Sequence, residues 1–334
     1  MEKRSKVINF KNSTYVAGYA AVGSKYEKDG RLGGQFDYIF DDPLAGKDSW
    51  EQAESELQKT AFEIAVKKSE NETKNIDVIF AGDLLNQCVG STFGIKKYDI
   101  PFVGVYGACS TMALSLIMAS AFVDGGFANL SAAITSSHYC SAERQYRFPL
   151  EYAGQRPPTS QWTATASGAV IVSNKKSEIS VKRAYIGEVV DYGIADANNM
   201  GAAMAPAAAD TIMRFLNDTN TLSVDYDKIF TGDLGKVGSE LFCDLLGKEG
   251  IDIIKQHEDC GLILYDRNKQ DVDAGGSGCG CSAAVLCTHI LNNLKSGAYK
   301  RVLFCATGAL LSPTTVQQGE NIPGIAHLLE LRKE

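Results

Sequence analysis

The chain contains an internal repeat, and this repeat limits the possible folds more than any other feature. The segment Asn75-Ile-Asp-Val-Ile-Phe-Ala-Gly-Asp-Leu84 matches Asp225-Tyr-Asp-Lys-Ile-Phe-Thr-Gly-Asp-Leu234 at six of ten positions, with an offset of 150. A second pair follows at an offset of 172, between GACS at 107–110 and GCGCS at 278–282. Two matches in the same order indicate a duplicated unit. The second copy then holds about 22 additional residues, which is the difference between the offsets.

Strands and helices are expected to alternate within each copy. Val78–Ala81 and Phe102–Tyr106 are short, apolar and bounded by turn residues, which predicts buried strands. Ser49–Lys68 carries an apolar helical stripe, and Asp48 or Ser49 can cap its start. Ser110–Val123 is apolar on nearly every face, so we expect a helix buried between two sheets. These patterns predict α/β layers.

The composition excludes several classes of protein. The chain has 33 Lys and Arg against 40 Asp and Glu, and a net charge of −7 disfavours nucleic acid as a partner. A hydrophobic share of 45% is too high for a disordered chain. The nine cysteines have no regular spacing, which indicates reduced thiols rather than a disulfide framework. We expect no signal peptide, and glycines interrupt the apolar stretches 100–123 and 274–294, so we also expect no transmembrane segment.

Cys109 lies at the most chemically informative position. The sequence Tyr106-Gly-Ala-Cys-Ser-Thr-Met places it at a tight turn between a predicted strand and a predicted buried helix. The free N–H groups and positive dipole of a helix N-terminus stabilise a thiolate. This position therefore suits a nucleophilic cysteine. The alternative is a core cysteine at an ordinary strand-to-helix turn, and the local sequence favours neither.

These features together resemble the thiolase superfamily, which includes the ketoacyl synthases. The resemblance depends on Gly107-Ala-Cys-Ser-Thr, the long buried helix, the duplicated halves and the strand Gly168-Ala-Val-Ile-Val. It implies an α/β fold that is a thiolase-like duplicated five-layer α-β-α-β-α sandwich. Residues 1–178 would form the first half, with a pocket loop at 138–165, and residues 179–334 the second. The resemblance also implies a homodimer that pairs through the strand at 102–106.

A more specific similarity links the chain to a family of thiolase-fold proteins of endospore-forming bacteria. It covers AGDLLNQ (81–87), TSSHYCSAERQYRFPLEYAGQRP (135–157) and ATGALLSP (306–313), among other segments. This similarity implies a protein of sporulation and spore germination that binds dipicolinic acid, free or as its calcium chelate. It would be a peripheral subunit of a transport complex at the forespore or spore inner membrane, with membrane-embedded sporulation proteins as partners. We expect no cofactor and no resident metal, although Ca²⁺ can accompany the ligand.

The similarity also bears on catalysis. In thiolase-fold condensing enzymes, His or Asn residues from two loops of the second half serve the cysteine. The corresponding positions here are Asp233 and Gly280, the latter between Cys279 and Cys281. Losing an oxyanion donor costs about 10²–10³ in rate and losing acid–base help a further ~10²–10⁴, so we expect a very poor Claisen catalyst. One alternative is an acyl-transferring or condensing enzyme with Cys109 as its nucleophile, and another is a purely structural subunit with a vestigial pocket.

The loop at 138–165 supplies further candidates for ligand binding. His138 is a possible ligand donor or replacement base, and the alternative is a hydrogen-bonded loop histidine. Arg144, Arg147 and Arg156 suit a flat dicarboxylate because a guanidinium binds carboxylates in a planar, bidentate manner. The alternative is surface pairing with neighbouring glutamates, and Arg144 is favoured because it is nearest His138. Aromatic side chains of the same loop are candidate walls of the pocket: Tyr146, Phe148 and Trp162.

Polar residues after the first repeated strand complete the predicted site. Asp83, Asn86 and Gln87 can hydrogen-bond a pyridine dicarboxylate or coordinate an accompanying Ca²⁺. Because Asp83 and Asp233 are repeat equivalents, a structural capping role shared by both is the alternative. The predicted ligand-binding residues are therefore Cys109, His138, Arg144, Asp83, Asn86, Asp233 and Cys281.

Overall fold

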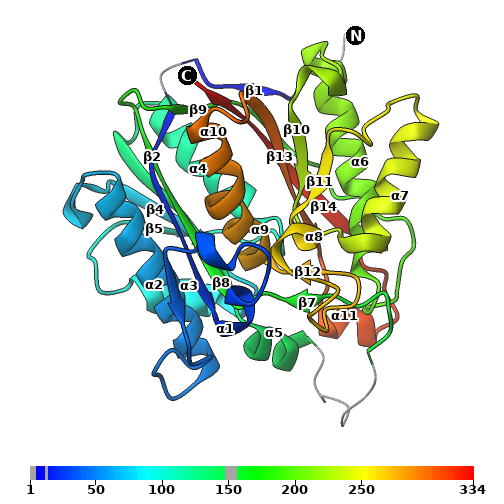
Figure 1. Ribbon diagram of the computed structural model, residues 1–334, viewed down its shortest axis with the longest axis horizontal. Coiled ribbons are helices and arrows are strands. Elements are labelled where there is room, and N and C mark those ends of the chain that lie inside the picture. Colours follow the sequence, from blue (N-terminus) through cyan, green and yellow to red (C-terminus); the bar gives the residue numbers. More distant parts are fainter. Residues whose placement is uncertain (1–4, 12–13, 147–155) are drawn as a thin grey trace.

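Two sets of five strands form the centre of the molecule, which is described here by a computed structural model over residues 5–11, 14–146 and 156–334 (Figure 1). The first set comprises β2 (Tyr15–Ser24), β4 (Val78–Gly82), β5 (Phe102–Gly104), β6 (Leu130–Ser137) and β8 (Ala166–Ser173). The second set comprises β9 (Ile179–Ile186), β10 (Lys228–Thr231), β11 (His257–Asp259), β13 (Arg301–Ala309) and β14 (Gly324–Lys333). The spatial orders are β5-β4-β6-β8-β2 and β11-β10-β13-β14-β9, so corresponding strands occupy corresponding places.

The direction of pairing repeats as well. β4 is parallel to β5 and β6, and β10 is parallel to β11 and β13, whereas the remaining pairs of each set are antiparallel. Tyr15 of β2 pairs with Ser180 of β9, and this contact joins the two sets into one sheet. Short strands add to it: β1 (Ile8–Asn9) pairs with β9 and β3 (Tyr38–Phe40) with β2. A separate two-stranded sheet pairs β7 (Trp162–Thr163) with β12 (Gly276–Ser277).

Helices cover both outer faces and fill the space between the two sets of strands. In the first half α2 (Trp50–Lys68) and α3 (Val89–Ile95) lie outside, and in the second half α6 (Met200–Thr219) and α7 (Gly235–Lys248) do (Figure 1). Between the sets lie α4 (Thr111–Asp124) and the continuous helix of α9 (Cys279–Val285), a π-helical turn (Leu286–Ile290) and α10 (Leu291–Ser296). The predicted α-β-α-β-α sandwich is confirmed. Short helices complete the fold: α1 (Lys25–Lys28), α5 (Tyr139–Tyr146), α8 (Cys260–Leu264) and α11 (Pro313–Gln317).

The duplication extends to individual hydrogen bonds. Asp77 Oδ2 accepts from the backbone N–H groups of Asn129 and Leu130, at 2.7 and 3.0 Å. Its repeat equivalent Asp227 accepts in the same way from the two N–H groups before and at the start of β13, at 2.7 and 2.8 Å. Each carboxylate thus satisfies two backbone donors where the next strand begins, which explains why the repeat retains this residue.

One predicted strand differs from expectation. Phe102–Tyr106 was predicted to be buried, but β5 ends at Gly104 and lies at the edge of the sheet, with only β4 as a partner. Phe102 and Val103 are 36% and 38% exposed. The apolar sequence therefore marks an open edge rather than the interior, and a one-dimensional pattern cannot distinguish the two.

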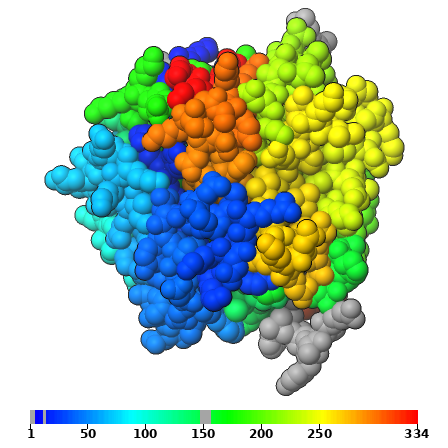
Figure 2. Space-filling view, viewed as in Figure 1, coloured from blue at the N-terminus to red at the C-terminus, as the bar shows by residue number. Residues whose placement is uncertain are grey.

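The two halves also meet at the surface. In Figure 2 the first-half segment around α1 lies beside the second-half segment around α8. Arg31 N donates to the Leu264 carbonyl at 3.1 Å, and Gln270 Nε2 donates to the Tyr26 carbonyl at 2.8 Å. Across the described parts of the chain, no helix combines the length and the apolar character that crossing a lipid bilayer requires.

Candidate functional site

Cys109 lies in the turn that connects β5 to α4, and its side chain is buried. The turn is held by its own side chains, because Ser110 Oγ donates to the Gly107 carbonyl and Thr111 Oγ1 to the Ala108 carbonyl, both at 2.6 Å. Ala108 has a φ of 50°, in the left-handed region that costs a residue with a Cβ. The surrounding contacts therefore maintain a strained backbone next to the thiol.

Asp233 is the principal charged neighbour of Cys109, and its carboxylate lies beside the thiol. The same carboxylate accepts from Thr307 Oγ1 at 2.8 Å, from Ser277 Oγ at 3.1 Å and from Gly278 N at 2.8 Å. Burial, and then the neighbouring carboxylate, raise the pKa of Cys109 well above its ordinary value. Burial also raises the pKa of Asp233 to about 6. The arrangement keeps the thiol protonated at neutral pH.

The Gly-rich turn before α9 supplies backbone rather than side chains to this region. Gly278 has a φ of 93°, which favours glycine. A Cβ at Gly280 would lie 2.4 Å from the Ala166 carbonyl oxygen, so a larger side chain does not fit. Cys279 Sγ donates to the Ser136 carbonyl at 3.0 Å. Cys281 is fully buried in the core and does not line a cavity beside Cys109.

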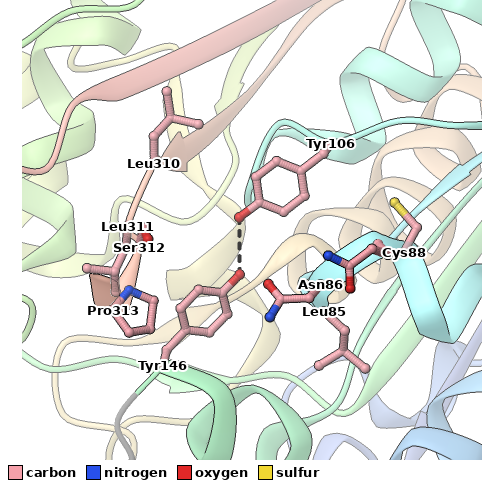
Figure 3. Close-up of a pocket in the computed structure, with 10 residues that line it drawn as sticks. Leu85, Asn86, Cys88, Tyr106, Tyr146, Leu310, Leu311, Ser312 and Pro313 are labelled. Carbon is pink, nitrogen blue, oxygen red and sulfur yellow. Dashed lines mark hydrogen bonds between the residues drawn. The ribbon is translucent and has the colours of Figure 1, made fainter. Parts of the chain in front are cut away.

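Two adjacent cavities open from the loops around Cys109. The outer cavity has a volume of about 380 Å³ and is lined by Leu85, Asn86, Gln87, Cys88, Tyr106, Tyr146, Leu310, Leu311, Ser312 and Pro313. The inner cavity, of about 30 Å³, is lined by Leu84, Tyr106, Ala108, Cys109, Ala142, Tyr146, Thr163, Met200, Ser277, Ala309 and Leu311. Figure 3 shows Tyr106 and Tyr146 pointing toward each other, and their hydroxyl oxygens are 3.1 Å apart.

The structure places only part of the predicted site around these cavities. Cys109 and Asp233 lie together, and Asn86 lines the outer cavity. Asp83 is buried beside this loop, where it accepts from Ser91 N and Oγ at 2.8 and 2.6 Å and from Leu85 N at 2.9 Å. These bonds cap the start of α3. Asp83 and Asp233 therefore have different roles, although they are repeat equivalents: Asp83 caps α3, and Asp233 lies beside Cys109.

His138 and Arg144 lie away from both cavities. His138 Nε2 lies 2.8 Å from the Pro43 carbonyl oxygen, and Nδ1 accepts from Cys140 N at 3.2 Å, so both ring nitrogens are engaged. Burial lowers the pKa of His138, which favours a neutral ring that donates through Nε2. Arg144 pairs with Glu51 at the surface and stacks over Trp50. For both residues, the contacts match the alternatives named above rather than a place in the pocket.

The rest of the predicted loop is only partly described. Arg156 binds Asp273 at 3.1 Å and lies 4.9 Å from the centre of the Trp162 ring. Trp162 stacks on Tyr139 with ring centres 3.8 Å apart. Arg147 and Phe148 lie outside the described residues. Arg156 is therefore paired with an acidic residue of the second half and lines neither cavity.

Sequence reasoning missed several residues near the site. Leu310–Pro313 lies in the segment ATGALLSP, which carried the resemblance but received no role. Glu54 of α2 is fully buried beside Asp83 and accepts from Ser136 Oγ and Ser141 Oγ, each at 2.9 Å. Burial, and then the charge of Asp83, raise the pKa of Glu54 to about 8. A glutamate within a helical pattern predicts an exposed face, so the sequence contains no signal for this buried acid.

The described residues contain no group of three or more His, Cys, Asp or Glu side chains positioned to hold a metal ion. The oxygens of Asp83, a predicted Ca²⁺ ligand, already accept hydrogen bonds from Leu85 and Ser91. The polar residues that line the outer cavity instead carry amides and hydroxyls, and they include Asn86, Gln87, Ser312 and the two tyrosines.

Comparison with known proteins identifies relatives of this chain. Residues 4–332 match the family of stage V sporulation protein AD. The chain is 46% identical over 318 residues to Stage V sporulation protein AD of Bacillus subtilis strain 168, across 95% of this chain and 94% of that protein.

Solved structures with much lower sequence identity have the same fold. Cerulenin-bound OleA of Xanthomonas campestris is 13% identical with a TM-score of 0.63, over 99% of this chain and 100% of that chain. The 3-oxoacyl-[acyl-carrier-protein] synthase III of Aquifex aeolicus VF5 is 13% identical with a TM-score of 0.60, over 96% and 99%. At these identities the likeness concerns the fold, and it confirms the predicted thiolase-like architecture.

Proposed function

The chain belongs to the stage V sporulation protein AD family, and from this premise we propose that it binds dipicolinic acid, free or as its calcium chelate, without catalysing a reaction. In this proposal it is a peripheral subunit at the forespore or spore inner membrane. Membrane-embedded sporulation proteins of the same complex are its partners. The bound ligand is taken up during sporulation and released during germination.

The outer cavity is the observation that carries the proposal. Its volume of about 380 Å³ lies within the range of about 300–1,000 Å³ that is usual for small-molecule pockets. The amide groups of Asn86 and Gln87 and the hydroxyl of Ser312 are donors for carboxylate oxygens. The Tyr106 and Tyr146 rings and the neighbouring leucines offer a surface for a flat pyridine ring. The described lining contains neither Lys nor Arg, so neutral donors would have to bind the carboxylates.

The environment of Cys109 supports the absence of catalysis in the proposal. A condensing reaction needs a thiolate nucleophile and a donor for the thioester oxygen. The Asp233 carboxylate favours the neutral thiol, and Gly280 stands in close backbone packing that admits no side-chain donor. Both features work against a thioester on Cys109.

Isothermal titration calorimetry with dipicolinate, with and without Ca²⁺, tests the proposed binding. We expect saturable binding to the wild-type protein, and about tenfold weaker binding for Asn86→Ala or Ser312→Ala, because each loses a hydrogen bond to a carboxylate. Arg144→Ala is the matched control, since Arg144 pairs with Glu51 at the surface, and its affinity should not change. Isophthalate, which lacks the ring nitrogen, is the control ligand.

Two results would count against the proposal. If no heat of binding is measured at millimolar dipicolinate, the proposed ligand is wrong. If all variants bind with equal affinity, the binding site does not lie in the outer cavity. Acyl transfer to Cys109 from acyl-CoA, detected by mass spectrometry and lost in Cys109→Ala, would instead favour the enzymatic alternative.

A further inference from the structure

Three residues separate the two cavities beside Cys109. Tyr106, Tyr146 and Leu311 line both the outer cavity of about 380 Å³ and the inner cavity of about 30 Å³ (Figure 3). The inner cavity, which the Cys109 side chain lines, has room for about two water molecules. We call these three residues the wall between the cavities. A ring-sized molecule fits in the outer cavity but not in the inner cavity.

Hydrogen bonds close the wall. Tyr146 Oη donates to the Leu84 carbonyl, so its oxygen is left to accept from Tyr106 Oη at 3.1 Å. Gln145 Nε2 donates to the same Leu84 carbonyl at 2.9 Å, and its Oε1 accepts from Asn86 N at 2.9 Å. The end of α5 is thus bound to the loop after β4, and Tyr146 is held firmly in the wall.

Tyr106 is held less firmly than Tyr146. Tyr106 is 47% exposed, whereas Tyr146, the last residue of α5, is partly buried against the loop after β4. Water can replace the hydrogen bond from Tyr106 to Tyr146 at small net cost, because both groups are neutral and one already faces solvent. Rotation of the Tyr106 ring would join the two cavities without breaking the bonds that fix Tyr146.

We propose that Tyr106 and Tyr146 form a gate that controls access from the outer cavity to Cys109. With the hydroxyl groups paired, water alone reaches the thiol. When Tyr106 turns toward solvent, a planar ring of pyridine size enters and contacts Cys109. The identity of that ligand depends on the function proposed above, whereas the gate does not.

Alkylation of individual cysteines, resolved by peptide mass spectrometry without any ligand, tests the gate. Cys88 lines the outer cavity, Cys243 is half-buried on α7, and Cys305 is fully buried in β13. We expect iodoacetamide to modify Cys109 up to about tenfold faster in Tyr146→Phe, which loses both hydrogen bonds, and faster still in Tyr106→Ala. Cys88 and Cys243 should react as in the wild type. Tyr98→Phe is the matched control, because it loses a hydrogen bond to Glu63 far from the cavities.

Unchanged Cys109 alkylation in both gate variants, with Cys305 still protected, would overturn the proposal. If Cys305 becomes reactive, the variant has unfolded. The gate is then tested on the wild-type protein with two reagents of different size. In the wild type, the ratio of Cys109 to Cys88 alkylation should be much lower with N-phenylmaleimide, which carries a ring, than with the smaller iodoacetamide. An equal ratio for both reagents would also overturn the proposed gate.

A separate alkylation experiment, with dipicolinate present, connects the gate to the ligand. Saturating dipicolinate should slow Cys109 alkylation in Tyr106→Ala, because the ring then occupies the joined cavity. If calorimetry detects no dipicolinate binding, the proposed function fails. The ligand-free alkylation rates still decide the gate, so the two failures can be told apart.

Discussion

At the scale of single residues, Cys109 and Asp233 determine what the site can do. The cysteine occupies the strand-to-helix turn where a nucleophile would stand, but its thiol lies beside a buried carboxylate. A negatively charged carboxylate disfavours a second negative charge on the neighbouring sulfur. The pair is therefore most stable with the proton on sulfur. In the second half, Asp259 accepts from Leu234 N and Gly235 N and so caps the loop after β10. Asp233 is thereby left to face Cys109.

Replacing Asp233 with Asn should change how stability depends on pH. Burial raises the pKa of Asp233 from its ordinary 3.8 to about 6. The folded protein therefore binds more protons than the unfolded chain, and the free energy of unfolding falls as pH rises from about 4 to about 6, by at most about 1.4 kcal/mol per pH unit. Urea unfolding across this window should show the fall in the wild type and a flatter profile in Asp233→Asn.

The exposed carboxyl of Asp41 supplies the control for this measurement, and Asp41→Asn should keep the wild-type profile. A profile of Asp233→Asn that is parallel to the wild type would contradict the assignment of this pKa. Removing the charge should also lower the pKa of Cys109, which the pH dependence of its alkylation reports.

At the scale of elements, the glycines of the turn before α9 determine how closely the halves approach. Gly280 packs against Ala166 and Ser137 of the first half, and Gly278 N donates to Asp233. The sequence shows that the His and Asn of condensing enzymes are absent here. The structure adds a physical reason for position 280, where there is no space for either side chain. Strand β5 is the element that sequence reasoning placed wrongly, because edge and interior strands have the same apolar pattern.

Gly280→Ala should destabilise the protein by about 1–3 kcal/mol through overpacking, because the added Cβ would meet a backbone carbonyl at 2.4 Å. Gly247→Ala in α7 is the matched control. A Cβ there would meet no atom within 4 Å beyond its chain neighbours and the backbone of its own helix, so this change should stabilise the helix by about 0.5–1 kcal/mol. Urea unfolding measures both, and a neutral Gly280→Ala would show that the two halves can move apart.

At the scale of the whole molecule, duplication produces a sheet with two open ends, formed by β5 and β11. β5 is short, apolar and exposed, and an edge of this kind pairs readily with another strand. We propose that the protein is a homodimer in which β5 of one protomer pairs with β5 of its partner. The same edge leads directly into the turn that holds Cys109.

Val103→Lys should convert this dimer into monomers, because a charged side chain on an edge strand opposes pairing. Size-exclusion chromatography with light scattering measures the mass of both forms. Val189→Lys alters another exposed valine, outside β5, and should leave the mass unchanged. A wild-type protein that is monomeric at high concentration would disprove the dimer.

The sequence by itself determined the duplicated α/β architecture, the buried central helix and the turn around Cys109. Local periodicity and short repeated motifs carry that information, since they depend on neighbouring residues. Only the tertiary structure decided which side chains face the cavities. The outer cavity combines the loop after β4, Tyr106, Tyr146 and the segment at 310–313, which are distant in the sequence. His138 and Arg144 had suitable chemistry, but partners from the segment at 43–51 engage them elsewhere. Side-chain direction and partner choice arise from packing between distant segments, which no local pattern records.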